Sequence, residues 1–350
     1  MTNSSADKAA PGPEARLFAT GSLEAVASAF VAAGYRVVAP VRQGDLTRLA
    51  PWQAGQTIDL DHFTVNSAKE FLLPATETIQ RYDIDGNDFT PVEVAPDATK
   101  TVLLGIRPCD AAALTLMDTI FNWDFDDVFY NTRRQACTVV PLVCTRADES
   151  CFCTSVGLSP DSARNADVLR MFTAGGKKLI LAQLTEKGRE LAASAGAVAQ
   201  AAPDKAADVP VRFDVQAVTA WLADAFDSPA WTELSAGCLS CGACAYACGS
   251  CHCFDIQDES AAGGAVRYRN WDACCIALFT KHTSGHNPRS AAHARWRQRV
   301  MHKFSYIPQR FNMLGCTGCG RCTRLCPAGM TVAETCERID AICQSTPSPK

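Results

Sequence analysis

The chain has 350 residues, of which 47% are hydrophobic, and this is long enough for two or three domains with buried cores. Its formal net charge of −4 does not favour nucleic acid or an anionic membrane as a partner. No run of eighteen apolar residues predicts a membrane span, and residues 1–15 lack the apolar segment of a secretory signal. We therefore expect a cytoplasmic protein.

The first half of the chain alternates between predicted helices and predicted strands. A helix with a serine N-cap and a closing glycine is predicted over 22–34, and a strand over 35–41 follows it. Short apolar runs predict buried strands over 101–107 and 137–144, with a helix over 109–121 between them. A strand–helix–strand order of this kind indicates a partly parallel, mixed sheet.

Three further segments complete this half. Residues 167–194 predict a hairpin and then a helix, with Gly175 and Gly176 in the turn. The alanine-rich stretch 195–210 predicts a surface excursion, and 215–228 an amphipathic helix.

Composition divides the chain into two domains and two tails. Residues 1–13 and 344–350 are expected to be disordered. We expect an N-terminal domain of the α/β or α+β class with a mixed sheet over 14–230. A helical, ferredoxin-like domain is expected over 231–343, with a long insertion between its two cysteine motifs.

Nineteen cysteines are the most unusual feature of the composition. A disulfide scaffold would need an oxidising compartment, for which the sequence has no export signal. Buried structural thiols would explain single residues such as Cys137 or Cys343, but they would not explain cysteines that occur in clusters. Clustered cysteines therefore predict metal binding.

A cysteine motif occurs twice. Residues 238–248, CLSCGACAYAC, and residues 316–326, CTGCGRCTRLC, both have the spacing C-x2-C-x2-C-x3-C. This spacing is typical of a [4Fe–4S] cluster, and in two-cluster ferredoxins the fourth cysteine of each run ligates the other cluster. That rule predicts two clusters, with the ligand sets Cys238, Cys241, Cys244 and Cys326, and Cys316, Cys319, Cys322 and Cys248. The alternative is a zinc-stabilised interaction module, although zinc usually takes two separated cysteine pairs.

Basic residues surround the second motif. Residues 273–333 contain nine Lys or Arg and no Asp or Glu. A basic field would stabilise the reduced state of a cluster, since each cubane with four thiolates is an anion. For most of these residues, however, we expect the solvated face of a helix over 287–304. A docking face for an acidic partner is a third interpretation. No nucleic-acid-binding motif accompanies the basic residues.

Two further groups of cysteines lie outside the repeated motif. Cys109 follows one predicted strand, Cys144 ends the next, and a C-x-C pair comes soon after. Because the ends of parallel strands meet at one edge of a sheet, Cys109, Cys144, Cys151 and Cys153 are candidates for a third cluster. The alternative is scattered buried or reactive thiols. A second group, Cys251, Cys253 and Cys274, could cap a cluster or ligate one with help from His252.

At this point the sequence resembles a known family. The segments that carry the resemblance are KEFLLPATETIQRYD, GIRPCDAAAL, CFCTSVG, CHCFD, WDACC, HTSGHNPR and RQRVMHKFSY. They are similar to the beta subunit of cytosolic sulfhydrogenase-type [NiFe] hydrogenases. They are equally similar to the iron–sulfur, electron-transfer component of anaerobic sulfite reductase and to related 4Fe-4S dicluster proteins. The resemblance covers residues 60–335 and includes the cysteines of all the groups above.

The resemblance implies an electron-transfer subunit without catalytic residues of its own. Its partners would be a flavin- and NAD(P)-binding subunit, together with the small and large subunits of a hydrogenase. In the alternative, the partner would be the sirohaem subunit of sulfite reductase. The sequence agrees with a non-catalytic role, since it has no G-x-G-x-x-G after a strand, no Walker A loop and no hydrolase triad motif.

Overall fold

The computed structural model describes most of the chain, with seven segments left out. The described residues are 17–20, 22–174, 178–183, 185–195, 205–261 and 264–345. The parts of the predictions that lie outside them are the first tail, the glycine turn at 175–176, residues 196–204 of the excursion and residues 346–350 of the second tail.

A four-stranded mixed sheet forms the centre of the first half. Its strand order is β3 (Leu46–Pro51), β2 (Arg36–Gln43), β6 (Thr101–Ile106) and β7 (Cys137–Pro141). Strands β2, β6 and β7 run parallel, while β3 is antiparallel to β2. The predicted partly parallel, mixed sheet is therefore confirmed.

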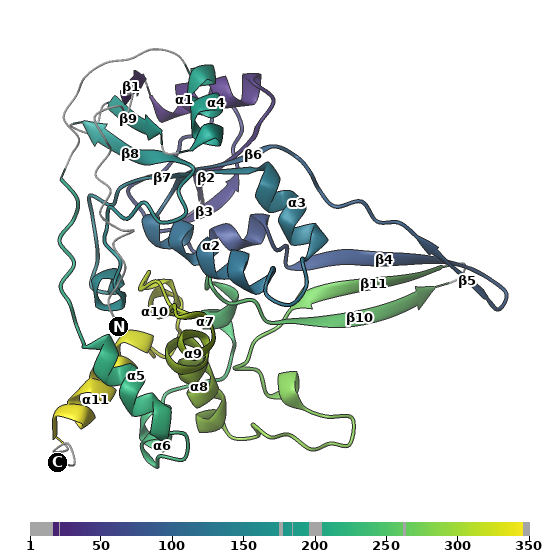
Figure 1. Ribbon diagram of the computed structural model, residues 1–350, viewed down its shortest axis with the longest axis vertical. Coiled ribbons are helices and arrows are strands. Elements are labelled where there is room, and N and C mark those ends of the chain that lie inside the picture. Colours follow the sequence, from purple (N-terminus) through teal and green to yellow (C-terminus); the bar gives the residue numbers. More distant parts are fainter. Residues whose placement is uncertain are drawn as a thin grey trace.

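Helices cover both faces of this sheet (Figure 1). They are α1 (Leu23–Ala32), α2 (Pro108–Ile120), α3 (Val128–Ala136) and α4 (Glu186–Ala195). Successive side chains of a strand point to opposite faces. Val102 and Leu104 accordingly pack in one core with residues of α1 and α4, while Leu103 packs in another with residues of α2 and α3. The Ser22 side chain caps α1, as expected, by accepting a hydrogen bond from the Ala25 N–H.

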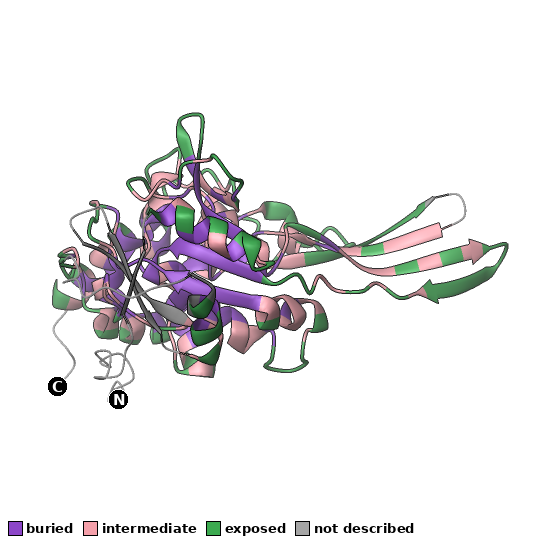
Figure 2. Ribbon diagram, turned by 90° about the horizontal axis from the view of Figure 1, so that it is seen from above, coloured by how far each residue is buried: buried purple, intermediate pink, exposed green. Residues whose placement is uncertain are grey.

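A second, antiparallel sheet extends from the body of the molecule as an arm (Figure 2). Its strand order is β10 (Phe254–Ala261), β11 (Gly264–Trp271), β4 (Thr76–Asp85) and β5 (Asp88–Val92). The pairing of β11 with β4 joins segments from the two sides of the expected domain boundary at residue 230, which itself stays a prediction. The sequence analysis did not anticipate this arm, because most of its described side chains are exposed or half-buried on both faces.

Buried ion pairs fix the root of the arm. Glu77 on β4 pairs with Arg133 of α3 and with Arg269 of β11. Arg269 also contacts the carboxylate of Asp127 at 2.5 Å. Asp127 in turn caps α3 by accepting a hydrogen bond from the Tyr130 N–H.

A small sheet and a helical region complete the described part of the chain. The sheet has the order β1 (Leu17–Thr20), β9 (Lys178–Gln183) and β8 (Val168–Ala174). The larger helices of the last third are α5 (Val215–Asp224), α6 (Ala230–Leu234), α8 (Ala292–Met301), α9 (Ile307–Phe311) and α11 (Val332–Ser345). Helices α5, α6, α8 and α11 share a core around Trp231, Trp296 and Phe304. No helix among the described residues is long and apolar enough to cross a membrane.

Candidate metal centre

The two copies of the cysteine motif have the same local structure. In each, a glycine with positive φ precedes a one-turn helix: Gly242 (φ 78°) begins α7 (Ala243–Tyr246), and Gly320 (φ 70°) begins α10 (Arg321–Arg324). A left-handed backbone at these positions favours glycine, which has no Cβ. The two short helices contact each other, so the two loops meet in space although the chain makes a long excursion between them.

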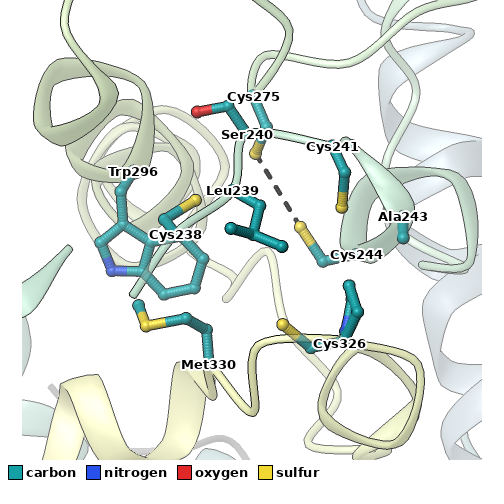
Figure 3. A pocket seen from close by; sticks show the side chains of 12 residues that line it. Cys238, Leu239, Ser240, Cys241, Ala243, Cys244, Cys275, Trp296, Cys326 and Met330 are labelled. Atoms are coloured by element: carbon teal, nitrogen blue, oxygen red, sulfur yellow. Dashed lines mark hydrogen bonds between the residues drawn. The ribbon is translucent and has the colours of Figure 1, made fainter. Parts of the chain in front are cut away.

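The first pocket lies where the loops meet. It encloses about 380 Å³, partly open to solvent. The thiols of Cys238, Cys241 and Cys244 line it together with that of Cys326, which comes from the other motif. Figure 3 shows these four side chains around one space. The structure thus brings Cys326 to the three cysteines of the first motif, where the predicted crossover would use it as a ligand.

A fifth cysteine lines the same pocket and was missed by the sequence analysis. The Cys275 Sγ lies 3.9 Å from the Cys244 Sγ. The sequence analysis singled out only the adjacent Cys274. The two consecutive cysteines of the WDACC segment were the feature from which Cys275 could have been predicted.

The second predicted ligand set is less closely gathered. Cys248 interacts electrostatically with Cys316, Cys319 and Cys322, which lie on the other loop. The Gly318 N–H donates to the Cys316 Sγ at 3.5 Å, and glycine-rich loops commonly present such N–H groups to cluster sulfurs. The Cys319 thiol, however, contacts Cys109 and lines a different pocket.

That second pocket gathers the other candidate cluster ligands. It encloses about 510 Å³ and is lined by the cysteines predicted to converge there, Cys109, Cys144, Cys151 and Cys153, and by Cys319. Cys109 follows β6 and Cys144 follows β7. The pocket thus lies beyond the carboxyl ends of two parallel strands, where α/β sheets usually bind ligands.

Arginines give the second pocket a basic lining. The Arg321 Nη2 lies 2.9 Å from the Asp110 carboxylate, and both side chains are buried. Arg324 pairs with Asp148 at 2.6 Å and also donates to the Cys151 Sγ at 3.2 Å. Cations this close to sulfur would stabilise bound thiolates.

Burial and hydrogen bonding affect the thiols differently. Burial raises the pKa of Cys153 and of Cys316 to about 12. A hydrogen bond with Cys109 lowers the pKa of Cys319 to about 6. Without a metal, Cys153 and Cys316 would therefore be neutral thiols at neutral pH, and metal binding by them would release protons.

The third group of cysteines also comes together. Cys253 interacts with Cys274, and Cys251 interacts with Cys248. His252, in the same C-x-C segment, packs against His302 with the ring centroids 5.4 Å apart. Burial lowers the pKa of both imidazoles to about 4, so both are neutral at neutral pH.

The expectation that most basic residues lie on a solvated helix face over 287–304 is wrong for three of them. Arg295, Arg299 and Lys303 are buried. Arg295 donates to backbone carbonyls of Cys275, Arg289 and Ser290. Arg299 donates to the Cys244 carbonyl at 2.7 Å, and the Lys303 Nζ lies 3.4 Å from the Cys248 Sγ. These side chains point toward the cysteines because the sulfur-rich loops pack on this side of the helix.

The donor set fits iron–sulfur clusters better than a single ion. In the described part of the chain, no three His, Cys, Asp or Glu side chains converge closely enough to hold one metal ion. Zinc requires sulfur at about 2.3 Å. A cubane holds its thiolates farther apart, because four irons and four sulfides lie between them. Four thiols around a cavity of about 380 Å³ agree with that wider spacing.

A comparison with protein families supports this interpretation. Residues 237–330 match the family described as a 4Fe-4S dicluster domain. This part of the chain is therefore similar to 4Fe-4S dicluster domains. It contains the first pocket, both cysteine motifs, and the buried Arg299 and Lys303.

The chain is also similar to a curated relative over most of its length. It is 28% identical over 328 residues to sulfhydrogenase 2 subunit beta of Pyrococcus furiosus, and this match covers 87% of the chain and 92% of the relative. The resemblance to sulfhydrogenase-type beta subunits is thereby confirmed. No solved structure matches the chain.

Proposed function

We propose that this chain is the electron-transfer subunit of an oxidoreductase complex. In this proposal it relays electrons between a subunit that reacts with flavin and NAD(P)H and the catalytic module of a [NiFe] hydrogenase. The observation that carries the proposal is that Cys326 of the second motif lines the same pocket as three cysteines of the first. The similarity to a sulfhydrogenase beta subunit supports the hydrogenase context.

Two [4Fe–4S] clusters would be held by the repeated motifs. The first set is Cys238, Cys241, Cys244 and Cys326, and the second is Cys316, Cys319, Cys322 and Cys248. When bound, each cluster would accept and release one electron at a potential set by nearby charge, hydrogen bonds and solvent. The protein would hold the clusters in place and stabilise the added electron with the buried Arg299 and Lys303.

A third cluster would be held in the second pocket by Cys109, Cys144, Cys151 and Cys153. These four thiols line one cavity of about 510 Å³ together with Cys319, and Arg107, Arg321 and Arg324 also line it. This donor set has the number and type of ligands that a cubane takes.

A sirohaem sulfite reductase is the second candidate for the partner that receives the electrons. The same relay would serve a sirohaem sulfite reductase, which the sequence resembles equally. Co-purification of the chain from its own organism, followed by analysis of nickel and sirohaem, distinguishes the two. Nickel without sirohaem supports the hydrogenase, and sirohaem without nickel supports sulfite reduction.

The cluster proposal is tested by metal analysis of anaerobically purified chain. From the three clusters of this proposal we expect at least about twelve irons and an equal amount of acid-labile sulfide, four for each cluster, and reduced-state EPR signals. Zinc without sulfide would contradict the relay and support a zinc-stabilised module instead. Reduction by a flavoprotein with NADPH or NADH, followed by the visible absorbance of the clusters, tests the direction of transfer.

A further inference from the structure

Cys251, Cys253 and Cys274 lie at the root of the arm, outside both predicted ligand sets. The ladder of β10 and β11 begins at the pair Phe254 and Trp271, so the C-x-C segment and the segment after β11 emerge side by side. The Asp272 N–H donates to the Cys253 carbonyl at 3.0 Å, which continues the ladder by one step. This register brings the Cys253 thiol to that of Cys274.

The thiols at this root form a continuous series that reaches both motif-derived sets. Cys274 interacts with Cys275, whose Sγ lies 3.9 Å from the Cys244 Sγ in the first pocket. At the other end, Cys251 interacts with Cys248 of the second set. The group therefore lies between the two sets.

Three cations are buried against these thiols. Lys69 is 3% exposed, Arg299 is 1% exposed and Lys303 is 4% exposed. Within the described ranges, none of the three forms an ion pair with a carboxylate. A buried charge without a counter-charge is strongly unfavourable, so a fold that keeps three together requires an anion beside them.

The contacts of the cations indicate where that anion lies. The Arg299 Nη1 lies 3.5 Å from the Cys251 Sγ, and its Nε has no hydrogen-bond partner in the described residues. Lys69 has Cys251, Cys248 and Cys253 as its attractive neighbours, and its Nζ lies 3.7 Å from the centre of the Trp271 ring. Lys303 contacts Cys248, so it is already matched to a proposed ligand of the second cluster. Lys69 and Arg299 remain, and Cys251 is a neighbour of both.

Thiolates bound to iron would balance these cations. We propose that Cys251, Cys253 and Cys274 ligate an additional [4Fe–4S] cluster, and that Cys275 is placed to supply the fourth thiolate. A cubane with four thiolates carries two negative charges in its oxidised state, which matches the two cations. The site rests on the proposed function, because it presupposes an iron–sulfur protein. It adds a relay point between the two motif clusters.

Serine variants of the full chain, purified anaerobically, test the proposal. Cys251→Ser and Cys253→Ser should each lose about four irons and four sulfides and the same EPR component, while the other cluster signals persist. Cys343→Ser is the matched control and should keep full iron, because Cys343 lies outside all the cysteine groups and its thiol donates a hydrogen bond to the Ala217 carbonyl. Full iron in either variant overturns the proposal. Loss of different EPR components by the two variants also overturns it.

A second measurement decides the question if these variants fail to fold. The double variant Cys144→Ser/Cys151→Ser would lose the cluster proposed for the second pocket. It keeps the four ligands proposed here, Cys251, Cys253, Cys274 and Cys275. We expect about twelve irons there, whereas about eight would mean that only the motif clusters are present and would overturn the proposal. That outcome leaves the proposed function standing, whereas a wild-type chain without iron and sulfide would remove both.

Discussion

The backbone N–H of Phe152 donates a hydrogen bond to the carbonyl oxygen of Gly318 at 2.9 Å. This bond joins the C-F-C segment after the central sheet to the loop of the second cysteine motif. A Cβ added at Gly318 would lie 2.5 Å from backbone atoms of Phe152 and Cys153. The two segments therefore fit together only because residue 318 has no side chain.

Gly318→Ala is expected to separate the two segments. The residue has φ +64°, so alanine adds backbone strain to the clash, and we expect a loss of stability above the roughly 1–3 kcal/mol of strain alone. Chemical denaturation of the loaded protein measures the change. Gly329→Ala is the matched control, with φ +66° and nothing within 4 Å of the added Cβ. Equal losses in the two variants would contradict a role for the close approach.

Cys326→Ser tests the exchange of ligands between the motifs. Because Cys326 lines the pocket of the first motif, we expect it to remove the same EPR component as Cys241→Ser. Cys319→Ser should remove a different component. If Cys326→Ser and Cys319→Ser instead remove the same signal, each motif keeps its own fourth cysteine and the exchange is wrong.

Asp110→Asn should destabilise the protein strongly. The substitution leaves the Arg321 guanidinium buried without its counter-charge, and breaking a buried pair in this way costs about 3–5 kcal/mol. Thermal unfolding measures the effect. The control is Asp258→Asn on the arm, where the partner is the exposed Arg267 and no measurable change is expected. A similar Tm for both variants would contradict this account of the Arg321 pair.

Removal of iron should lower the local stability of the cysteine-rich region more than that of the central sheet. Without clusters, Lys69, Arg299 and Lys303 lose the anions that we propose beside them, whereas the sheet of β2, β6 and β7 keeps its apolar cores. Hydrogen exchange should therefore accelerate in α8 and in the two motif loops, while β6 stays protected. Uniform acceleration along the chain would show that the two parts unfold together.

Local sequence patterns were sufficient to predict three of the four strands of the central sheet. Strand β3 and helix α3 were not predicted. Strand β6 is a short apolar run whose residues are all buried, and the helix α2 that follows it has its expected bounds within a residue or so. The spacing of cysteines likewise predicted that Cys326 belongs with Cys238. These features depend on neighbouring residues or on a repeated motif, both of which can be read from the sequence.

Features that depend on distant partners were missed. The strands of the arm have polar side chains on both faces, so they lack the alternation that identifies a half-buried strand. Arg299 and Lys303 were assigned to a solvated face, because a basic helix with no acidic residues nearby usually lies in water. Their burial depends on the sulfur-rich loops that pack over them, and periodicity within the helix contains no information about those loops.

The shared first pocket also restricts the order of biogenesis. Three of its thiols belong to the motif that begins at Cys238, but the fourth comes from Cys326, after the arm and α8 have been made. A ribosome must therefore translate the whole intervening segment before the pocket can close around a cofactor. We infer that the cluster is inserted after this segment has been synthesised. Until then the thiols of the nascent chain must stay reduced and free of metal.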